Sequence, residues 1–184
     1  MAATFEWDED TGTATGSPAK GTTRTTAVTD VNWKNSGVQT DVYSSFPITA
    51  GNNSFEKWQF GKFTGTFNNL LSGLFAHTLT AFGTGLTLNG PPLCTGDASR
   101  LLYTTPSATT NANLTNDMTT AISISSGVAV AFGATGPEAT GKAATVDGSA
   151  TRYTNYLTTQ LITTSSAAAG DTAQVTLTLQ YAEN

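Results

Sequence analysis

The fold class is decided by the stretch Val175-Thr-Leu-Thr-Leu-Gln-Tyr181. Apolar side chains occupy every second position, and threonine or glutamine occupies the positions between them. Successive side chains of a β-strand point to opposite faces of the sheet, so this alternation predicts a strand with one buried and one polar face. The same pattern, traced back along the chain, predicts several more short strands.

Clusters of Gly, Pro, Asn and Ser separate these further strands. Val128, Val130 and Phe132 alternate with alanine, and residues 86–88 alternate after a Gly-Thr-Gly turn. Residues 153–162 carry apolar side chains at both odd and even positions, which is typical of a strand buried on both faces. The final strand, 174–181, is expected to pair with 153–163 across a loop.

Short strands spaced by turns, without alternating helical segments, predict an all-β chain folded as an antiparallel β-sandwich. The chain has one cysteine, Cys94, and so lacks the cysteine pair of an immunoglobulin domain, which favours a jelly-roll-like arrangement. The sandwich is predicted to span residues 27–184. Its predicted core includes Trp58, Phe60, Val130, Phe132, Leu177 and Leu179.

The densest aromatic stretch is Phe55-Glu-Lys-Trp-Gln-Phe-Gly-Lys-Phe-Thr-Gly-Thr-Phe67. Within the strand expected here, the aromatic residues change from even to odd positions after Phe60, which predicts a β-bulge at Gly61-Lys62. Residues 68–77 space their apolar side chains as a helix does, which predicts one or two helical turns there.

Residues 1–26 are predicted to form an extended N-terminal arm, because they lack a hydrophobic period and are rich in turn-forming residues. The acidic run Asp8-Glu-Asp10 is interpreted as a solvated turn. The alternative, a calcium site, lacks the downstream Glu of a calcium loop. Phe5 and Trp7 are large anchors that a free tail gains nothing by exposing, so they are predicted to dock on a neighbouring subunit.

Composition excludes several classes of partner. Only 11% of the 184 residues are charged, against about 25% in an ordinary domain, and 37 are threonine. The eight Lys and Arg are scattered singly and the net charge is −5, so no nucleic-acid partner is expected. No apolar run is long enough to span a membrane, and the first residues lack a signal-peptide pattern. We expect a protein made in a cytoplasm, without a membrane partner.

The sequence offers little for catalysis. His77 is the one histidine, it lies in an apolar stretch, and no Gly-x-Ser-x-Gly motif accompanies it. One histidine and one cysteine cannot form a zinc site within the chain. The Gly-rich strings lack the Lys-Ser/Thr that completes a phosphate-binding loop. No catalytic, cofactor-binding or metal-binding residue is predicted, and we expect that the chain is not an enzyme.

Three stretches resemble small β-sandwich virion proteins of tailed bacteriophages. They are Asn52–Asn69, which contains the pattern Trp-x-Phe-x-x-Phe-x-Gly-x-Phe, then Gly83-Thr-Gly-Leu-Thr-Leu88, and the final Val-Thr-Leu-Thr-Leu-Gln-Tyr-Ala-Glu. The resemblance covers residues 45–90 and 153–184. It implies an architectural role in the virion, as a capsid decoration (cement) protein or as a head-to-tail or neck component. It carries over no functional residues.

Such a role implies partners of a particular kind. The expected partners are the major capsid protein or other virion proteins, together with copies of the chain itself, in a trimer. The alternative is a lectin-like carbohydrate-binding module of a tail or fibre, because jelly rolls also host sugar sites. In that alternative Trp7, Trp33 and Tyr43 are the candidate aromatic platforms for a sugar ring.

Overall fold

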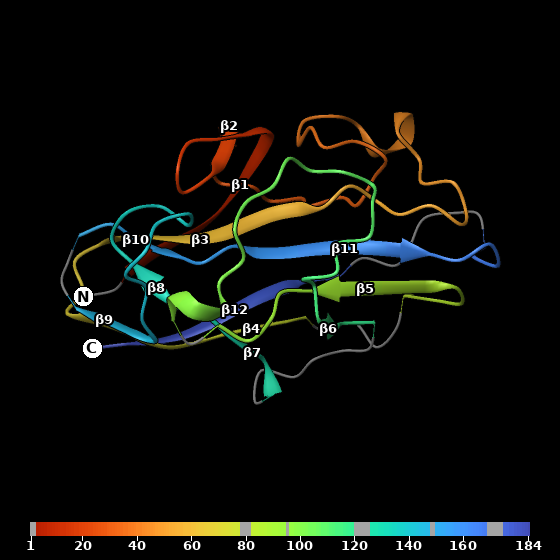
Figure 1. Cartoon of the computed structure of the whole chain (residues 1–184). Helices are drawn as coiled ribbons and strands as arrows, with labels where there is room; N and C mark the ends of the chain where they lie inside the picture. Colours follow the sequence, from red (N-terminus) through yellow and green to blue (C-terminus); the bar gives the residue numbers. More distant parts are fainter. Residues whose placement is uncertain (1–2, 78–81, 95, 120–125, 148–149, 169–174) are drawn as a thin grey trace.

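The computed structural model of the chain describes residues 3–77, 82–94, 96–119, 126–147, 150–168 and 175–184. Within these ranges the chain is all-β, with two antiparallel sheets arranged as a sandwich and no α-helix (Figure 1). Two 3₁₀ turns, η1 (Tyr43–Ser45) and η2 (Asp97–Ser99), lie in the connections. The predicted all-β sandwich is confirmed, and the strand order is compatible with a jelly roll.

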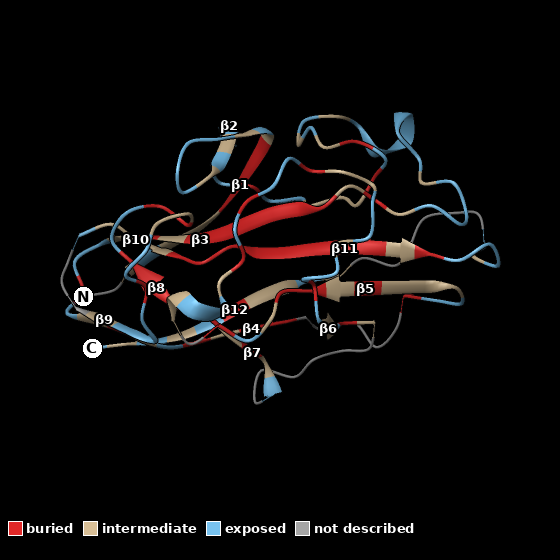
Figure 2. Cartoon of the chain, in the orientation of Figure 1, coloured by how far each residue is buried: buried red, intermediate tan, exposed pale blue. Residues whose placement is uncertain are grey.

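The larger sheet has a path of six strands, with two short strands beside it. In spatial order the path is β2 (Lys20–Thr25), β1 (Ala3–Thr15), β3 (Lys57–Gly65), β11 (Leu157–Thr163), β5 (Leu86–Gly90) and β6 (Asn116–Asp117). Beside it, β10 (Arg152–Thr154) pairs with β3 and with β8 (Phe132–Gly133). The most deeply buried strands are β3 and β11 (Figure 2).

The smaller sheet is built on β4 (Asn69–His77), which pairs with three other strands. These are β12 (Leu177–Glu183), β7 (Val128–Ala129) and β9 (Thr145–Asp147). The alternation predicted for the final strand is confirmed, because Leu179 is buried while Gln180 is exposed. The core between the sheets joins Phe63 and Leu161 of the larger sheet to Phe75 and Leu179 of the smaller one.

The predicted pairing of 153–163 with 174–181 is wrong. β11 pairs with β3 and β5, whereas β12 pairs with β4 in the other sheet. Both strands bury apolar side chains in the same core, Leu161 from one side and Leu179 from the other. They therefore face each other across the sandwich and do not lie edge to edge.

The prediction of an N-terminal arm is wrong for the described residues 3–25, which form β1 and β2. β1 pairs with β3 without a break, from Ala3 opposite Gly65 to Asp10 opposite Trp58. Phe5 and Trp7 pack against the chain's own core, with the Phe5 ring centroid 5.2 Å from that of Phe63. Pairing with β3 supplies the hydrogen bonds and the apolar surface that local sequence patterns do not reveal, so the sandwich includes residues 3–25.

The acidic run in β1 is buried and is not a solvated turn. Asp8, Glu9 and Asp10 are each 1% exposed. Arg24 of β2 donates to both carboxylate oxygens of Asp10, from Nε at 2.7 Å and Nη2 at 2.9 Å. Tyr156 donates its hydroxyl to the same carboxylate at 2.6 Å. These protein partners take the place of water around the Asp10 charge.

The predicted bulge at Gly61-Lys62 is wrong, because the register of β3 with β1 is regular there. Aromatic residues change parity because both faces of β3 are buried. Phe63 points into the core between the sheets, while Trp58 and Phe60 belong to a second cluster on the opposite face. A strand with apolar neighbours on both sides needs no phase change.

A bulge lies instead in β4, where helical turns were predicted. Gln180 faces Leu74 and Ala182 faces Leu71, so β4 has one residue more than β12 in this interval. Ser72 within it has a φ of 49°. The extra residue reverses the facing of the strand, and the apolar side chains before and after it then repeat at intervals that mimic a helix.

A third layer covers the outer face of the larger sheet. In Figure 1 the irregular segment 100–115 crosses in front of β3 and β11. It contributes Leu101, Tyr103 and Leu114 to the cluster that holds Trp58 and Tyr156. The hydroxyl of Tyr103 donates to the Gly12 carbonyl oxygen at 2.7 Å. This layer explains why so many residues of the larger sheet are buried on both faces.

Most of the predicted core is confirmed. Five of the six residues are buried and one, Leu177, is half-buried. The buried residues are Trp58, Phe60, Val130, Phe132 and Leu179.

Replacing Trp58 with Ala should lower the free energy of unfolding by about 3–5 kcal/mol, the usual cost of emptying a large aromatic site. Trp58 is 1% exposed, and its ring centroid lies 5.3 Å from that of Tyr156. Urea denaturation of both proteins measures the difference. The matched control is Leu102→Ala, since Leu102 is 57% exposed and its truncation should change stability by no more than about 0.5 kcal/mol. Equal stability of the Trp58 variant and the wild type would contradict the core assignment.

Candidate functional site

A long connection between β2 and β3, residues 26–56, folds against the sandwich and is organised around the buried side chain of Lys34. Lys34 is 1% exposed. Its ammonium group donates to the carbonyl oxygens of Gln39 at 2.8 Å and Asp41 at 2.5 Å. Burial lowers the pKa of Lys34. A buried cation that binds two backbone carbonyls fixes the course of the loop around it.

Further hydrogen bonds close this loop. The Asn35 amide donates to the Phe46 carbonyl at 2.8 Å, and the Ser36 hydroxyl donates to the carboxylate of Asp41. The Val38 amide donates to the Ser36 hydroxyl oxygen at 3.1 Å. Residues 36–46 are thus held from within.

Large apolar side chains project outward from the same loop. Four residues of this size are exposed in a stretch of nine: Val38 (50%), Val42 (60%), Tyr43 (45%) and Phe46 (38%). We call these four residues the apolar loop. Single exposed apolar residues are common on protein surfaces, but a group of them on an ordered loop is typical of an interaction site.

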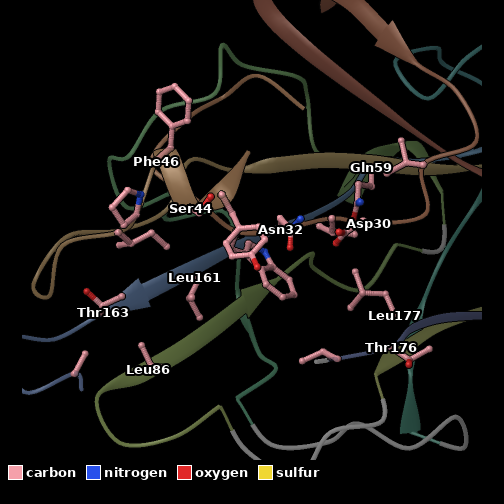
Figure 3. A pocket seen from close by; sticks show the side chains of 18 of the residues that line it. Asp30, Asn32, Ser44, Phe46, Gln59, Leu86, Leu161, Thr163, Thr176 and Leu177 are labelled. Carbon is pink, nitrogen blue, oxygen red and sulfur yellow. The ribbon is translucent and has the colours of Figure 1, made fainter. Parts of the chain in front are cut away.

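A pocket of about 1140 Å³ lies behind the apolar loop (Figure 3). Its walls come from residues 28–33, from the apolar-loop residues Tyr43 and Phe46, and from strands of both sheets. Leu86 of β5 and Leu161 of β11 line one part of it, and Leu177 of β12 lines another. The pocket therefore lies where the long connection covers the space between the two sheets.

The three aromatic residues proposed from sequence as sugar platforms, Trp7, Trp33 and Tyr43, all line this pocket. β1 holds Trp7, whose ring meets those of Phe5 and Phe75 at interplanar angles of 82° and 71°. The Trp33 indole donates through Nε1 to the Thr159 hydroxyl oxygen at 3.1 Å. The two indoles are therefore fixed before any ligand binds.

The pocket wall also contains Gln59 of β3, which is 1% exposed. Figure 3 places Gln59 and Asp30 at one end of the pocket, with Leu86 and Thr163 at the other end and Asn32 between them. Gln59 carries no signal in the sequence, because a polar residue in a strand that is buried on both faces has no distinguishing pattern.

A buried ion pair lies near this region. Lys57 Nζ is 3.6 Å from a carboxylate oxygen of Glu9, and the two side chains are 0% and 1% exposed. Burial raises the pKa of Glu9, and the charge of Lys57 opposes that change. Removing one partner of such a buried pair strongly destabilises the folded protein, because the other charge is then left unpaired in the interior.

A third buried lysine, after Lys34 and Lys57, lies at the other end of the larger sheet. Lys142 is 4% exposed, and its ammonium group donates to the Gly136 carbonyl oxygen at 2.6 Å. Burial lowers the pKa of Lys142 to about 8, although the charges of Glu138 and Asp97 oppose the change. Lone lysines are normally exposed, so neither Lys34 nor Lys142 carries a sequence signal for burial.

The other residues weighed from sequence are placed as follows. The Cys94 thiol is buried and donates to the Gly96 carbonyl oxygen at 3.2 Å. His77 ends β4, where its backbone pairs with Leu177, and its side chain lies outside what the structure describes. Phe5 and Trp7 line the chain's own core. Among those side chains of this group that the structure describes, Trp7 alone lines the pocket.

Neither a metal site nor a membrane-spanning helix is found among the residues that the structure describes. In the described ranges, no three side chains of His, Cys, Asp or Glu come together in a group that could hold a metal ion. Nor does the part of the chain that the structure covers contain a helix long and apolar enough to cross a membrane.

Comparison with known proteins gave no match: no family model fits the chain, and no significantly similar curated protein or solved structure was found.

The Lys142→Met variant should change how stability depends on pH. The pKa of Lys142 is about 8 in the folded chain and about 10.4 when unfolded, so folding favours its neutral form. Below pH 8 the folded chain bears the full cost of burying the charged ammonium group. This cost disappears as pH rises through the window between the two pKa values. The stability of the wild type relative to the variant should therefore rise by up to about 1.4 kcal/mol per pH unit there.

Urea denaturation of both proteins from pH 7 to 10 measures this difference. Other titrating groups occur in both proteins and cancel in the comparison. A difference that is constant across the range would contradict the buried placement of the Lys142 ammonium group.

Proposed function

We propose that the protein is a non-enzymatic structural component of a tailed-phage virion, and that it acts as a capsid decoration (cement) protein. In this role it stabilises the shell or the head–neck region through contacts with the major capsid protein or other virion proteins. The proposal starts from the resemblance of residues 45–90 and 153–184 to small β-sandwich virion proteins. The β-sandwich fold is compatible with it.

The observation that carries the proposal is the apolar loop. Its outward side chains are held on a framework that the buried Lys34 and the Ser36–Asp41 hydrogen bond make rigid. Binding through a rigid loop loses little conformational entropy, so the apolar area it buries contributes more directly to affinity. A lattice of identical sites then multiplies many modest contacts.

This assignment moves the proposed contact surface. The sequence predicted this surface at Phe5 and Trp7, which the structure packs against the chain's own core. The apolar loop takes over that role in the proposal. Val38 and Val42 are large hydrophobic residues that are exposed, whereas Phe5 and Trp7 of β1 are half-buried. We retain a trimer as the proposed assembly of the free protein, and light scattering after size exclusion measures it.

The test uses virus particles that lack this protein and the double variant Val38→Ser with Val42→Ser. Decoration should weaken by about tenfold or more, because serine removes the apolar contact area at the centre of the proposed surface. Occupancy of the particles, measured by electron microscopy over a range of protein concentrations, gives the affinity.

The matched control is the double variant Leu93→Ser with Leu102→Ser. These two leucines are 58% and 57% exposed, close to the 50% and 60% of Val38 and Val42, but they lie in other segments. The control should bind particles as the wild type does. If the loop variant also bound as the wild type does, or if the wild type did not bind at all, the proposal would be wrong.

A further inference from the structure

We propose that the pocket behind the apolar loop binds an uncharged saccharide. This inference goes beyond the assembly role. The pocket shares Tyr43 and Phe46 with the apolar loop, but Val38 and Val42, which the decoration assay tests, do not line it.

The pocket wall contains aromatic rings that suit a sugar. Trp7, Trp33 and Tyr43 come from three separate parts of the chain and line one cavity. Both faces of a sugar ring carry C–H groups, which pack on the electron-rich faces of aromatic rings. The indoles are fixed by β1 and by the hydrogen bond from Trp33 to Thr159, so stacking on them requires little reorganisation.

The pocket wall also supplies hydrogen-bonding groups. Gln59 is 1% exposed and is one of the residues that line the pocket. Its side-chain amide carries both donors and an acceptor. Asn32, Ser44 and Thr176 add amide and hydroxyl groups to the wall. Such groups donate and accept at once, as the hydroxyls of a sugar require.

The charge of the described lining favours a neutral ligand. Asp30 is the one acidic residue among the lining residues that the structure describes, and none of these lining residues is Lys, Arg or His. An anionic sugar would therefore meet a carboxylate and no compensating cation, on a chain whose net charge is −5. The lining selects against sialic and uronic acids and leaves neutral hexoses and N-acetylhexosamines.

The pocket is large enough for a sugar ring. Small-molecule sites typically have volumes of about 300–1,000 Å³, and this open pocket has a volume of about 1140 Å³. It has room for more than one sugar ring. A short oligosaccharide could contact the Asp30–Gln59 end and the Thr163 end together (Figure 3).

The experiment is a glycan array that carries neutral hexose- and N-acetylhexosamine-terminated glycans, together with sialylated and glucuronylated ones. Calorimetry with the best neutral glycan then measures its affinity. Tyr43→Ala should weaken that affinity by about tenfold, equivalent to about 1.4 kcal/mol. Trp33→Ala should do the same, and Trp33→Phe, which keeps an aromatic ring, should restore part of the loss.

The matched control is Leu102→Ala, which changes an exposed apolar residue outside both the apolar loop and the pocket lining. It should bind the glycan as the wild type does. Melting temperatures identify any variant that fails to fold, and Tyr43, which is 45% exposed, keeps the test valid if Trp33→Ala unfolds the chain.

Three results would overturn the saccharide proposal: no saturable binding to any neutral glycan, a preference for acidic glycans, or equal affinity of the folded Tyr43 variant and the wild type. The decoration assay with the Val38 and Val42 variant is independent of these results, so either proposal can fail alone.

Discussion

The rest of the structure depends on the burial of three consecutive carboxylates in β1. Asp8, Glu9 and Asp10 enter the interior because β1 pairs with β3 along eight residues. Burying a charge is costly unless it is paired and hydrogen-bonded. The fold must therefore bring a cation or a hydrogen-bond donor to each of these side chains.

The neighbouring elements are arranged to supply those partners. β2 brings Arg24 to Asp10, β3 brings Lys57 to Glu9, and the turn after β2 brings the amide of Ala27 to the Asp8 carboxylate at 3.1 Å. The chain between β2 and β3 starts from that turn and contains the third cation, Lys34, which organises the apolar loop. β1, β2 and the connection to β3 thus link the buried acids to the apolar loop and to the pocket behind it.

The sequence predicted the fold class and most of the core, because alternation along a strand depends on local order alone. Residues 153–162 and the final strand could be identified as strands in this way. Their partners could not, since pairing depends on where distant segments lie. The helical spacing in residues 68–77 was misleading for a physical reason: a bulge at Ser72 reverses the facing of a strand and produces the same intervals as a helix.

The candidate site could be predicted only in part. Trp7, Trp33 and Tyr43 were named from their residue type, and the structure brings all three to one pocket. Gln59 and Lys34 were missed. A polar side chain in a buried strand and an isolated lysine become informative only when their surroundings are known.

The central claim is that β1 is an integral strand of the larger sheet, and hydrogen exchange of the isolated chain tests it most directly. Mass spectrometry of peptides that cover residues 3–12 reports how often these amides open to solvent. The account predicts that they exchange as slowly as the amides of β3. Rapid exchange of residues 3–12, while β3 stays protected, would contradict it and would indicate that these residues form a free arm.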